Sequence, residues 1–241
     1  MKNYFLFTFL LFFLFGCEKN TCFENSGKVI TSPRIIAPPR EIRIYDNINV
    51  ILTQDSIDKM SIEAGENLQA FITTETNSEA LIIRNTAACK WLKSPSEKIN
   101  VYLSVTRLNK IVSEGSGNVT SSNMLQADHI IIDSDAGAGI VSLSLNAQHT
   151  RVVFPREGAD IILKGKSETC YTYCTSRATI NFKNFVVKKM EIDYGSVRNG
   201  FINVTESLTG RIYHTGNVLY SGNPASIKME ILSTGKLLRQ N

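Results

Sequence analysis

Histidines are the first side chains in this sequence that could carry out acid–base chemistry, and there are three of them: His129, His149 and His214. A hydrolytic triad needs a nucleophile, a base and an orienting acid in contact. No nucleophile-elbow motif lies beside His129 or His149. Because these two residues flank β-rich segments 20 residues apart, we expect their rings on one face of neighbouring repeats. We therefore predict that the histidines lie at the surface or at strand edges.

The aspartates Asp133 and Asp135 are the next candidates, because carboxylates can hold a metal ion or cleave polysaccharides. They flank Ser134, and alternation along a strand would place both on the same side. Calcium takes about six to eight oxygen ligands, and neighbouring segments add no acidic ladder. A solvated turn is the favoured interpretation and a calcium site is the alternative. We predict no catalytic residue, no metal and no cofactor.

Two cysteines are closely spaced in the segment Cys-Tyr-Thr-Tyr-Cys, at Cys170 and Cys174. An extended strand would separate their Cα atoms by about 13 Å, beyond the roughly 7 Å that a disulfide allows. Cys22 and Cys89 lie outside the regular β segments, so a bond between these two is possible and would fix the N-terminal segment to the body. Free thiols or another pairing are the alternatives. No C-x2-C pattern for zinc occurs.

Tyrosines form the last candidate site, because Tyr171 and Tyr173 point the same way from one predicted strand. Exposed aromatic rings can stack on a carbohydrate or contact a protein. The two residues therefore mark a possible binding face for a glycan or protein ligand. The alternative is that they fill the interior or cap an edge of the fold.

The N-terminus indicates how the protein is exported. Met1 and Lys2 precede an apolar run from Tyr4 to Phe15, which is typical of a secretory signal peptide. Leu-Phe-Gly-Cys at 14–17 resembles the lipobox of bacterial lipoproteins. That resemblance implies cleavage of residues 1–16 and acylation of Cys17 with a diacylglycerol and a further chain such as palmitate. An ordinary signal peptide with an incidental cysteine is the alternative. Residues 17–33, which are polar and contain Pro33, are predicted to be a tether.

The rest of the chain predicts an all-β fold built from repeats. Apolar residues alternate with polar ones from Ile42 onward, and no segment shows helical spacing. Small-residue motifs such as Gly-Ser-Gly-Asn-Val recur about every 20 residues, which is typical of coils in a parallel β-solenoid. A β-sandwich with glycine-rich turns is the alternative. Stacked coils would align one aliphatic position in the interior, at Val119, Val141, Ile161, Ile180, Val197 and Val218.

These features together resemble a known family. The opening strand Ile42–Leu52, the glycine-rich corners and the closing Tyr-x-Gly-x-Pro at 220–224 are similar to the auto-transporter adhesin head GIN domain family, common in Bacteroidetes lipoproteins. The resemblance covers residues 34–224 and leaves 225–241 as a C-terminal strand or tail. It implies a right-handed parallel β-helix with small accessory sheets. Because the family has no established catalytic residues, the resemblance assigns none to this sequence.

Charge and motif content narrow the function. The net charge of the 241-residue chain is +4 without any block of like charges, so nucleic-acid binding is not predicted. The leading hypothesis is a non-enzymatic cell-envelope lipoprotein, anchored by lipid with the outer membrane as the favoured location, whose solenoid presents a binding or adhesive surface. A carbohydrate-active β-helix enzyme is one alternative. The other is a structural envelope protein that self-associates through its solenoid ends.

Overall fold

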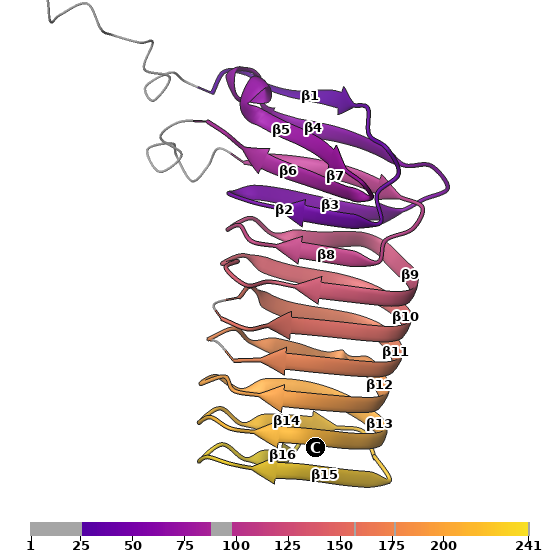
Figure 1. The fold of residues 1–241 in the computed structure, drawn as a ribbon, viewed down its shortest axis with the longest axis vertical. Coiled ribbons are helices and arrows are strands. Elements are labelled where there is room, and N and C mark those ends of the chain that lie inside the picture. Colours follow the sequence, from indigo (N-terminus) through magenta and orange to yellow (C-terminus); the bar gives the residue numbers. More distant parts are fainter. Residues whose placement is uncertain (1–25, 88–97, 157, 176, 241) are drawn as a thin grey trace, which may run out of the picture.

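The computed structural model describes residues 26–87, 98–156, 158–175 and 177–240. Its chain winds into a right-handed parallel β-helix, with smaller sheets gathered at the N-terminal end (Figure 1). The predicted fold class is therefore confirmed. Within the described ranges, no helix has both the length and the apolar character that crossing a membrane would require.

Two layers of strands make up the fold, and the long strands belong to both because each bends midway (Figure 1). Layer one starts with four strands in the order β1-β4-β7-β3, which span Val29–Arg34, Lys59–Gly65, Ile99–Val105 and Ile48–Gln54. Layer two starts with four strands in the order β5-β6-β2-β8, which span Ile72–Asn77, Ala80–Asn85, Glu41–Ile44 and Lys110–Ser113. A short 3-10 helix, Glu66–Phe71, connects β4 to β5.

The long strands then stack in parallel, and each supplies its first half to layer one and its second half to layer two. They are β9 to β13, which span Val119–Asp133, Ile140–Phe154, Asp160–Cys174, Ile180–Tyr194 and Gly200–Ile212. Beyond β13 the stack continues in separate short strands. In layer one β14 (Val218–Ser221) and β16 (Leu237–Arg239) extend the stack, and in layer two β15 (Ser226–Ile231) pairs with β13.

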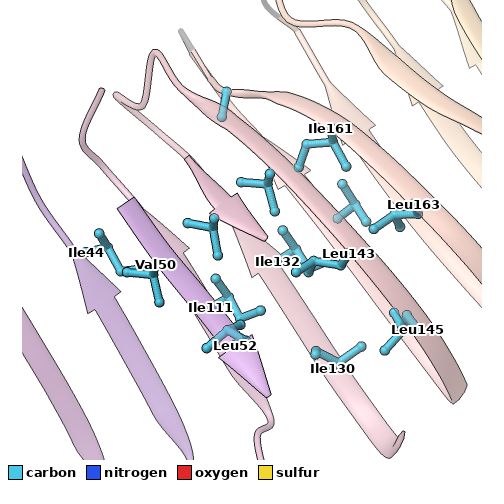
Figure 2. Packing of buried hydrophobic residues seen from close by; sticks show 14 of the residues in the cluster. Ile44, Val50, Leu52, Ile111, Ile130, Ile132, Leu143, Leu145, Ile161 and Leu163 are labelled. Atoms are coloured by element: carbon cyan, nitrogen blue, oxygen red, sulfur yellow. The ribbon is translucent and has the colours of Figure 1, made fainter. Parts of the chain in front are cut away.

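The core lies between the two layers, where inward side chains of successive rungs stack in columns. Leu143 and Leu145 of layer one point towards Ile130 and Ile132 of layer two (Figure 2), and all four are at most 2% exposed. One rung has a single inward row on each layer and cannot bury it alone, so the neighbouring rungs complete the core. Aliphatic side chains every second residue are thus the main source of stability.

The predicted interior column is confirmed at five of its six positions, and the register extends it in both directions. Val119, Val141, Ile161, Ile180 and Val218 are all fully buried, with Val119 next to Val50 and Val218 next to Leu237. Val197 was assigned wrongly. It is 47% exposed and lies in the corner before β13, and Gly200 takes its place beside Val218.

A tyrosine explains why glycine suffices at that column position. The ring of Tyr194 is fully buried, and its hydroxyl donates to the carbonyl of Arg198 at 2.6 Å. A Cβ placed on Gly200 would lie 2.9 Å from this ring and 2.9 Å from Ile180, which is too close for a side chain. The aromatic ring therefore fills the volume that an aliphatic residue fills in the other rungs.

A ladder of asparagine and aspartate side chains fixes the corners between rungs. Each member stands one residue before a column position, and its side-chain oxygen accepts the backbone N–H of the next rung at 2.7–3.2 Å. The members are Asn49, Asn118, Asp160, Asn199 and Asn217. Glycines let the corners approach closely, since a Cβ on Gly117 or Gly139 would overlap a backbone carbonyl of the rung before it.

The described fold begins before residue 34 and continues past 224. Residues 29–33, which were predicted to belong to the tether, form part of β1, and β1 pairs with β4 along its whole length. The segment 225–241, predicted as a strand or tail, contributes β15, which completes the rung of β14, and β16, which adds one more strand to layer one.

The Tyr194–Gly200 contact predicts energetic coupling between these two residues. We expect Gly200→Val and Tyr194→Leu each to lower the free energy of unfolding by about 2–4 kcal/mol, through overpacking and cavity formation respectively. The double variant should lose at least about 1 kcal/mol less than the sum. Urea unfolding of the four proteins measures this coupling, and strictly additive losses would contradict the packing described here.

Candidate ligand-binding face

The outward side chains of layer two form a regular lattice, because residues two apart on one rung and equivalent residues on successive rungs lie side by side. We call this lattice the tyrosine face. Its rows are the outward positions of β9 to β13: 129/131/133, 149/151/153, 169/171/173, 189/191/193 and 207/209/211. Residues about 20 apart in sequence thus become neighbours.

Tyr171 lies in the middle row and is partly buried by its neighbours. The guanidinium of Arg151 sits over its ring at 4.6 Å from the centroid, a cation–π geometry. Its hydroxyl donates to Asp193 Oδ2 at 3.5 Å. Partial burial is the main cause that raises the pKa of the Tyr171 hydroxyl, and the nearby negative charge of Asp193 raises it further. The ring is held in place while part of it remains open to a ligand.

Asp193 anchors the lower part of the face. Arg211 Nε and Nη2 donate to its two carboxylate oxygens at 2.8 and 2.9 Å, a bidentate arrangement. This hydrogen bonding holds the pKa of Asp193 below its usual range, although the residue is only 7% exposed. Tyr173 lies beside Asp193 in register. Tyr171 and Tyr173 therefore project to the same side, as the sequence predicted, over a fixed charge pair.

The upper part of the face carries the two histidines. The rings of His129 and His149 stack with centroids 4.5 Å apart and planes at 21°, as their spacing predicted. His149 Nδ1 lies 2.8 Å from Thr169 Oγ1, which ties the stack to the row of Tyr171. Aromatic surface therefore runs over several rungs of the tyrosine face.

A polar cavity of about 540 Å³ adjoins His129 where the solenoid meets the N-terminal sheets. We call it the corner cavity. Amide and charged side chains predominate in its lining, which includes Arg40, Gln54, Arg107, Gln126, Asp128, Asn146 and Gln148. Three of these amides are preorganised: Asn146 Nδ2 donates to Gln126 Oε1 at 2.8 Å, and Gln54 Oε1 accepts the Gln126 N–H at 2.9 Å. Such planar donors and acceptors are suited to hydroxyl-rich ligands.

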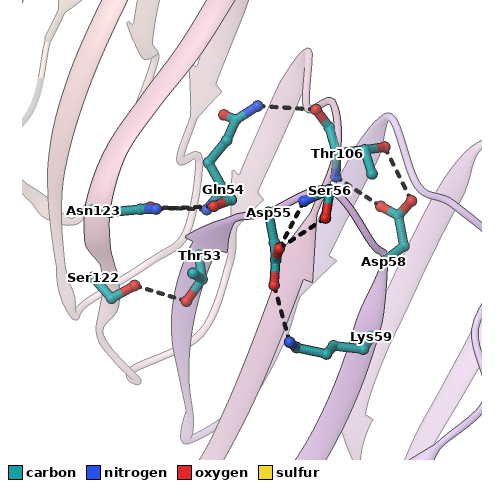
Figure 3. Close-up of polar contacts among 9 residues, drawn as sticks. All are labelled: Thr53, Gln54, Asp55, Ser56, Asp58, Lys59, Thr106, Ser122 and Asn123. Carbon is teal, nitrogen blue, oxygen red and sulfur yellow. Dashed lines mark hydrogen bonds and ion pairs between the residues drawn. The ribbon is translucent and has the colours of Figure 1, made fainter.

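Backbone and side-chain contacts hold the cavity wall to the solenoid (Figure 3). The side chain of Asn123 exchanges two hydrogen bonds with the backbone of Gln54, at 2.8 and 2.9 Å. Gln54 Nε2 donates to the Thr106 carbonyl at 2.9 Å. The register of β9 against β10 shifts at this point, so residues 121–123 of β9 bulge towards β3. This bulge joins the N-terminal sheets to the first long rung.

The remaining candidate chemistry has structural roles. Cys170 and Cys174 are buried in the core and are not bonded to each other, as their spacing predicted. Burial raises the pKa of Cys170 to about 12. Asp135 forms an ion pair with Arg156, whereas Asp133 faces Val153 on the next rung and burial raises its pKa. No group of three or more potential metal ligands occurs within the described ranges.

Three predicted site residues lie outside the described ranges. They are Cys17, the expected lipidation site, and Cys22 and Cys89, the possible disulfide. Acylation and pairing of these residues therefore remain predictions.

Sequence reasoning missed two parts of the site. It singled out Tyr171 and Tyr173 but not Arg151 and Asp193, which are 20–22 residues away from them, nor Arg211, which is 18 residues beyond Asp193. Applying the repeat register to outward positions would have found them. The corner cavity had no such signal, because its wall combines β9 with residues some 70 positions earlier.

Comparison with known proteins places the chain among relatives of this fold. A family described as "Putative auto-transporter adhesin, head GIN domain" matches residues 38–224. The chain belongs to this family. No curated protein matches it.

Solved structures agree with the head GIN domain assignment at the level of fold. A "putative adhesin" from Bacteroides fragilis has a TM-score of 0.79 and 20% identity, covering 88% of this chain and 97% of its own. A "putative lipid binding protein" from Parabacteroides distasonis has a TM-score of 0.68 and 16% identity, covering 89% of this chain and 98% of its own. A "putative adhesin" from Parabacteroides merdae has a TM-score of 0.64 and 16% identity, covering 89% of this chain and 97% of its own.

The Asp193–Arg211 pair predicts a pH-dependent contribution to stability. Because the folded-state pKa of Asp193 is depressed, its contribution is complete above the unfolded pKa of about 3.9 and is lost as pH falls through the lower folded value. We expect Asp193→Asn to cost about 1–3 kcal/mol at neutral pH. The difference from the parent should begin to shrink as the pH falls below about 4, and it should vanish once Asp193 is protonated in the folded protein as well.

Urea unfolding between neutral and acidic pH provides the measurement. Glu191→Gln, an exposed neighbour on the same strand, is the matched control and should change stability little. A cost of Asp193→Asn that stays constant over the whole pH range would contradict the ion pair.

Proposed function

We propose that this head GIN domain protein is a non-enzymatic binding module of the cell envelope, attached by lipid at Cys17, that binds a glycan through its tyrosine face and corner cavity. The observation that carries the proposal is the outward projection of Tyr171 and Tyr173 on a rigid lattice continuous with a polar cavity at His129. Aromatic rings and planar polar groups together suit the two kinds of surface that a sugar presents.

Preorganisation supports binding at this face. Arg151 and Asp193 hold Tyr171 from above and below in the stack, and hydrogen bonds fix the amides of the corner cavity before any ligand arrives. Groups that are already ordered lose less conformational entropy on binding. A solenoid side also offers an extended surface in place of a deep pocket, which fits recognition of a chain of sugars.

The names of the family and of its solved relatives support a binding role over catalysis. They describe adhesins and one lipid-binding protein. A glycosidase would pair an acid of raised pKa with a second, free carboxylate. Here burial raises the pKa of Asp133, but its neighbour Asp135 is held by Arg156. Asp133 is therefore the residue to test for the rival enzyme hypothesis.

The binding proposal predicts a loss of affinity when the tyrosine rings are removed. We expect the protein to bind members of a glycan array, and the double variant Tyr171→Ala/Tyr173→Ala to bind them at least about tenfold more weakly, because each stacked ring contributes roughly 1 kcal/mol. Tyr102→Ala is the matched control. Tyr102 is an outward tyrosine of layer one that is 40% exposed, and its removal should leave binding unchanged.

Three outcomes would contradict the proposal. Unchanged binding by the double tyrosine variant would place the ligand elsewhere. Release of reducing sugar that is abolished by Asp133→Asn would favour an enzyme. Cosedimentation with phospholipid vesicles in the absence of any glycan binding would favour a lipid ligand, like that named for the Parabacteroides distasonis relative.

The lipid anchor predicts a specific modification of the N-terminus. We expect mass spectrometry of the membrane-extracted protein to find Cys17 as the first residue, carrying a diacylglycerol and an acyl chain. Cells fed labelled palmitate should label the parent and the control variant Cys22→Ser but not Cys17→Ser. An intact Met1, or label retained by Cys17→Ser, would rule out the anchor.

A further inference from the structure

The last rung of layer two leaves its inner apolar row uncovered. Ile227 and Ile231 of β15 are 40% and 46% exposed, whereas Leu208 and Ile212, the residues in register on β13, are fully buried. Within the described ranges, β15 pairs with β13 alone, and no strand lies on its other edge. The strand contains no proline and carries no charge on its inner side, so it lacks the usual protection of a sheet edge.

The opposite end of the solenoid is built differently. There layer one ends in the antiparallel strand β1, which carries Pro33 within its paired length, and the 3-10 helix Glu66–Phe71 packs between β4 and β5. Proline cannot donate a ladder hydrogen bond and blunts an edge. Because the two ends are unlike, stacking of one end on the other is disfavoured, and contact between two copies of the C-terminal end is favoured.

The backbone of β15 defines which residues could pair with another strand. The N–H of Leu232 donates to Ile212 on β13 at 2.8 Å. Amides alternate along a strand, so those of Ile227, Met229 and Ile231 point to the free edge. A strand added there would hydrogen-bond to these three residues.

The charges of β15 select one register for a second copy. Outer residues Lys228 and Glu230 are both exposed, and they flank Met229. An antiparallel pair centred on Met229 places Lys228 opposite Glu230 of the other copy, twice by symmetry, and Ile227 opposite Ile231. Registers shifted by two residues would instead place Lys228 opposite Lys228 or Glu230 opposite Glu230, which is unfavourable.

Geometry strengthens these ion pairs. Because Met229 lies at a hydrogen-bonded position of the edge, Lys228 and Glu230 occupy the alternate positions, where antiparallel partners approach most closely. The twofold axis would run perpendicular to layer two, so that the inner row of one copy continues into the inner row of the other and both become covered.

We propose that two copies of this chain associate through their C-terminal ends, by antiparallel pairing of β15 with β15 centred on Met229. A twofold contact of this kind is closed and yields a dimer in which layer two runs on without interruption. The contact lies at the end of the stack, where β12 and β13 separate β15 from β11, the strand of Tyr171 (Figure 1). The dimer and the proposed glycan binding can therefore succeed or fail separately.

Sedimentation equilibrium of the mature lipidated protein in density-matched detergent tests the proposal. We expect the parent to be a dimer. Lys228→Glu makes both outer positions acidic and Glu230→Lys makes both basic, so each variant alone should dimerise about tenfold or more weakly. An equimolar mixture of the two variants should restore dimerisation, because acidic and basic rows then face each other.

Controls separate the contact from effects on folding. Ile227→Pro removes a donor from the free edge and none from the pairing with β13. Because Ile227 is 40% exposed, this variant should weaken the dimer about tenfold or more while leaving the melting temperature close to that of the parent. Lys164→Glu reverses the charge of an exposed residue on β11 and should leave dimerisation unchanged.

Several results would overturn the proposal. They are a parent protein that stays monomeric at all concentrations, a dimer that neither charge reversal weakens, a mixture of variants that stays monomeric, and assembly that continues beyond two copies. Vesicle or glycan binding by the monomeric variants would show that the tyrosine face is intact and that only the contact between copies has been lost.

Discussion

The structure depends on one constraint: parallel strands of successive rungs must stay in register. A rung has an inner row of apolar residues on each layer but nothing within the rung to cover it, so it is stable only between neighbours at a spacing of about 4.8 Å. The side chain at every inward position must therefore fit the side chains of the neighbouring rungs in the same column. Tyr194 can replace a column residue because its ring reaches the volume above Gly200, and the same constraint leaves Ile227 and Ile231 exposed where the stack stops.

Sequence reasoning recovered the fold because the constraint is written in the sequence as a repeat. Buried positions such as Val141 and Ile161 had to be apolar, and their spacing of about 20 residues followed from the length of one rung. It failed at Val197 because Gly195-Ser196 imitates the glycine corner of earlier rungs. The better signal was an asparagine or aspartate one residue before the column, which points to Asn199-Gly200. That signal arises from side-chain hydrogen bonds that composition and alternation do not reveal.

The candidate site shows the same division between repeated and unrepeated features. Outward positions follow the repeat, so Tyr171 and its contacts with Arg151 and Asp193 lie at predictable places in the lattice. The corner cavity does not follow it. Gln54 meets Gln126 only because the bulge of β9 and the separate N-terminal strands β3 and β7 are packed together. The N-terminal sheets do not follow the repeat of the solenoid. Contacts between the two parts therefore have no regular spacing in the sequence from which they could be predicted.

The direction of the hydrogen bonds would have a mechanical consequence if the protein is held at its N-terminal side, as the proposed anchor at Cys17 implies. Ladder hydrogen bonds run along the long axis of the solenoid, so tension along this axis would load the outermost strand first and peel it away bond by bond. That strand is β1, whose only described partner strand is β4. Its release would lengthen the connection to the point of attachment while the rungs that carry Tyr171 and Tyr173 keep their shape. β1 would thus detach and dissipate force before the tyrosine face is deformed.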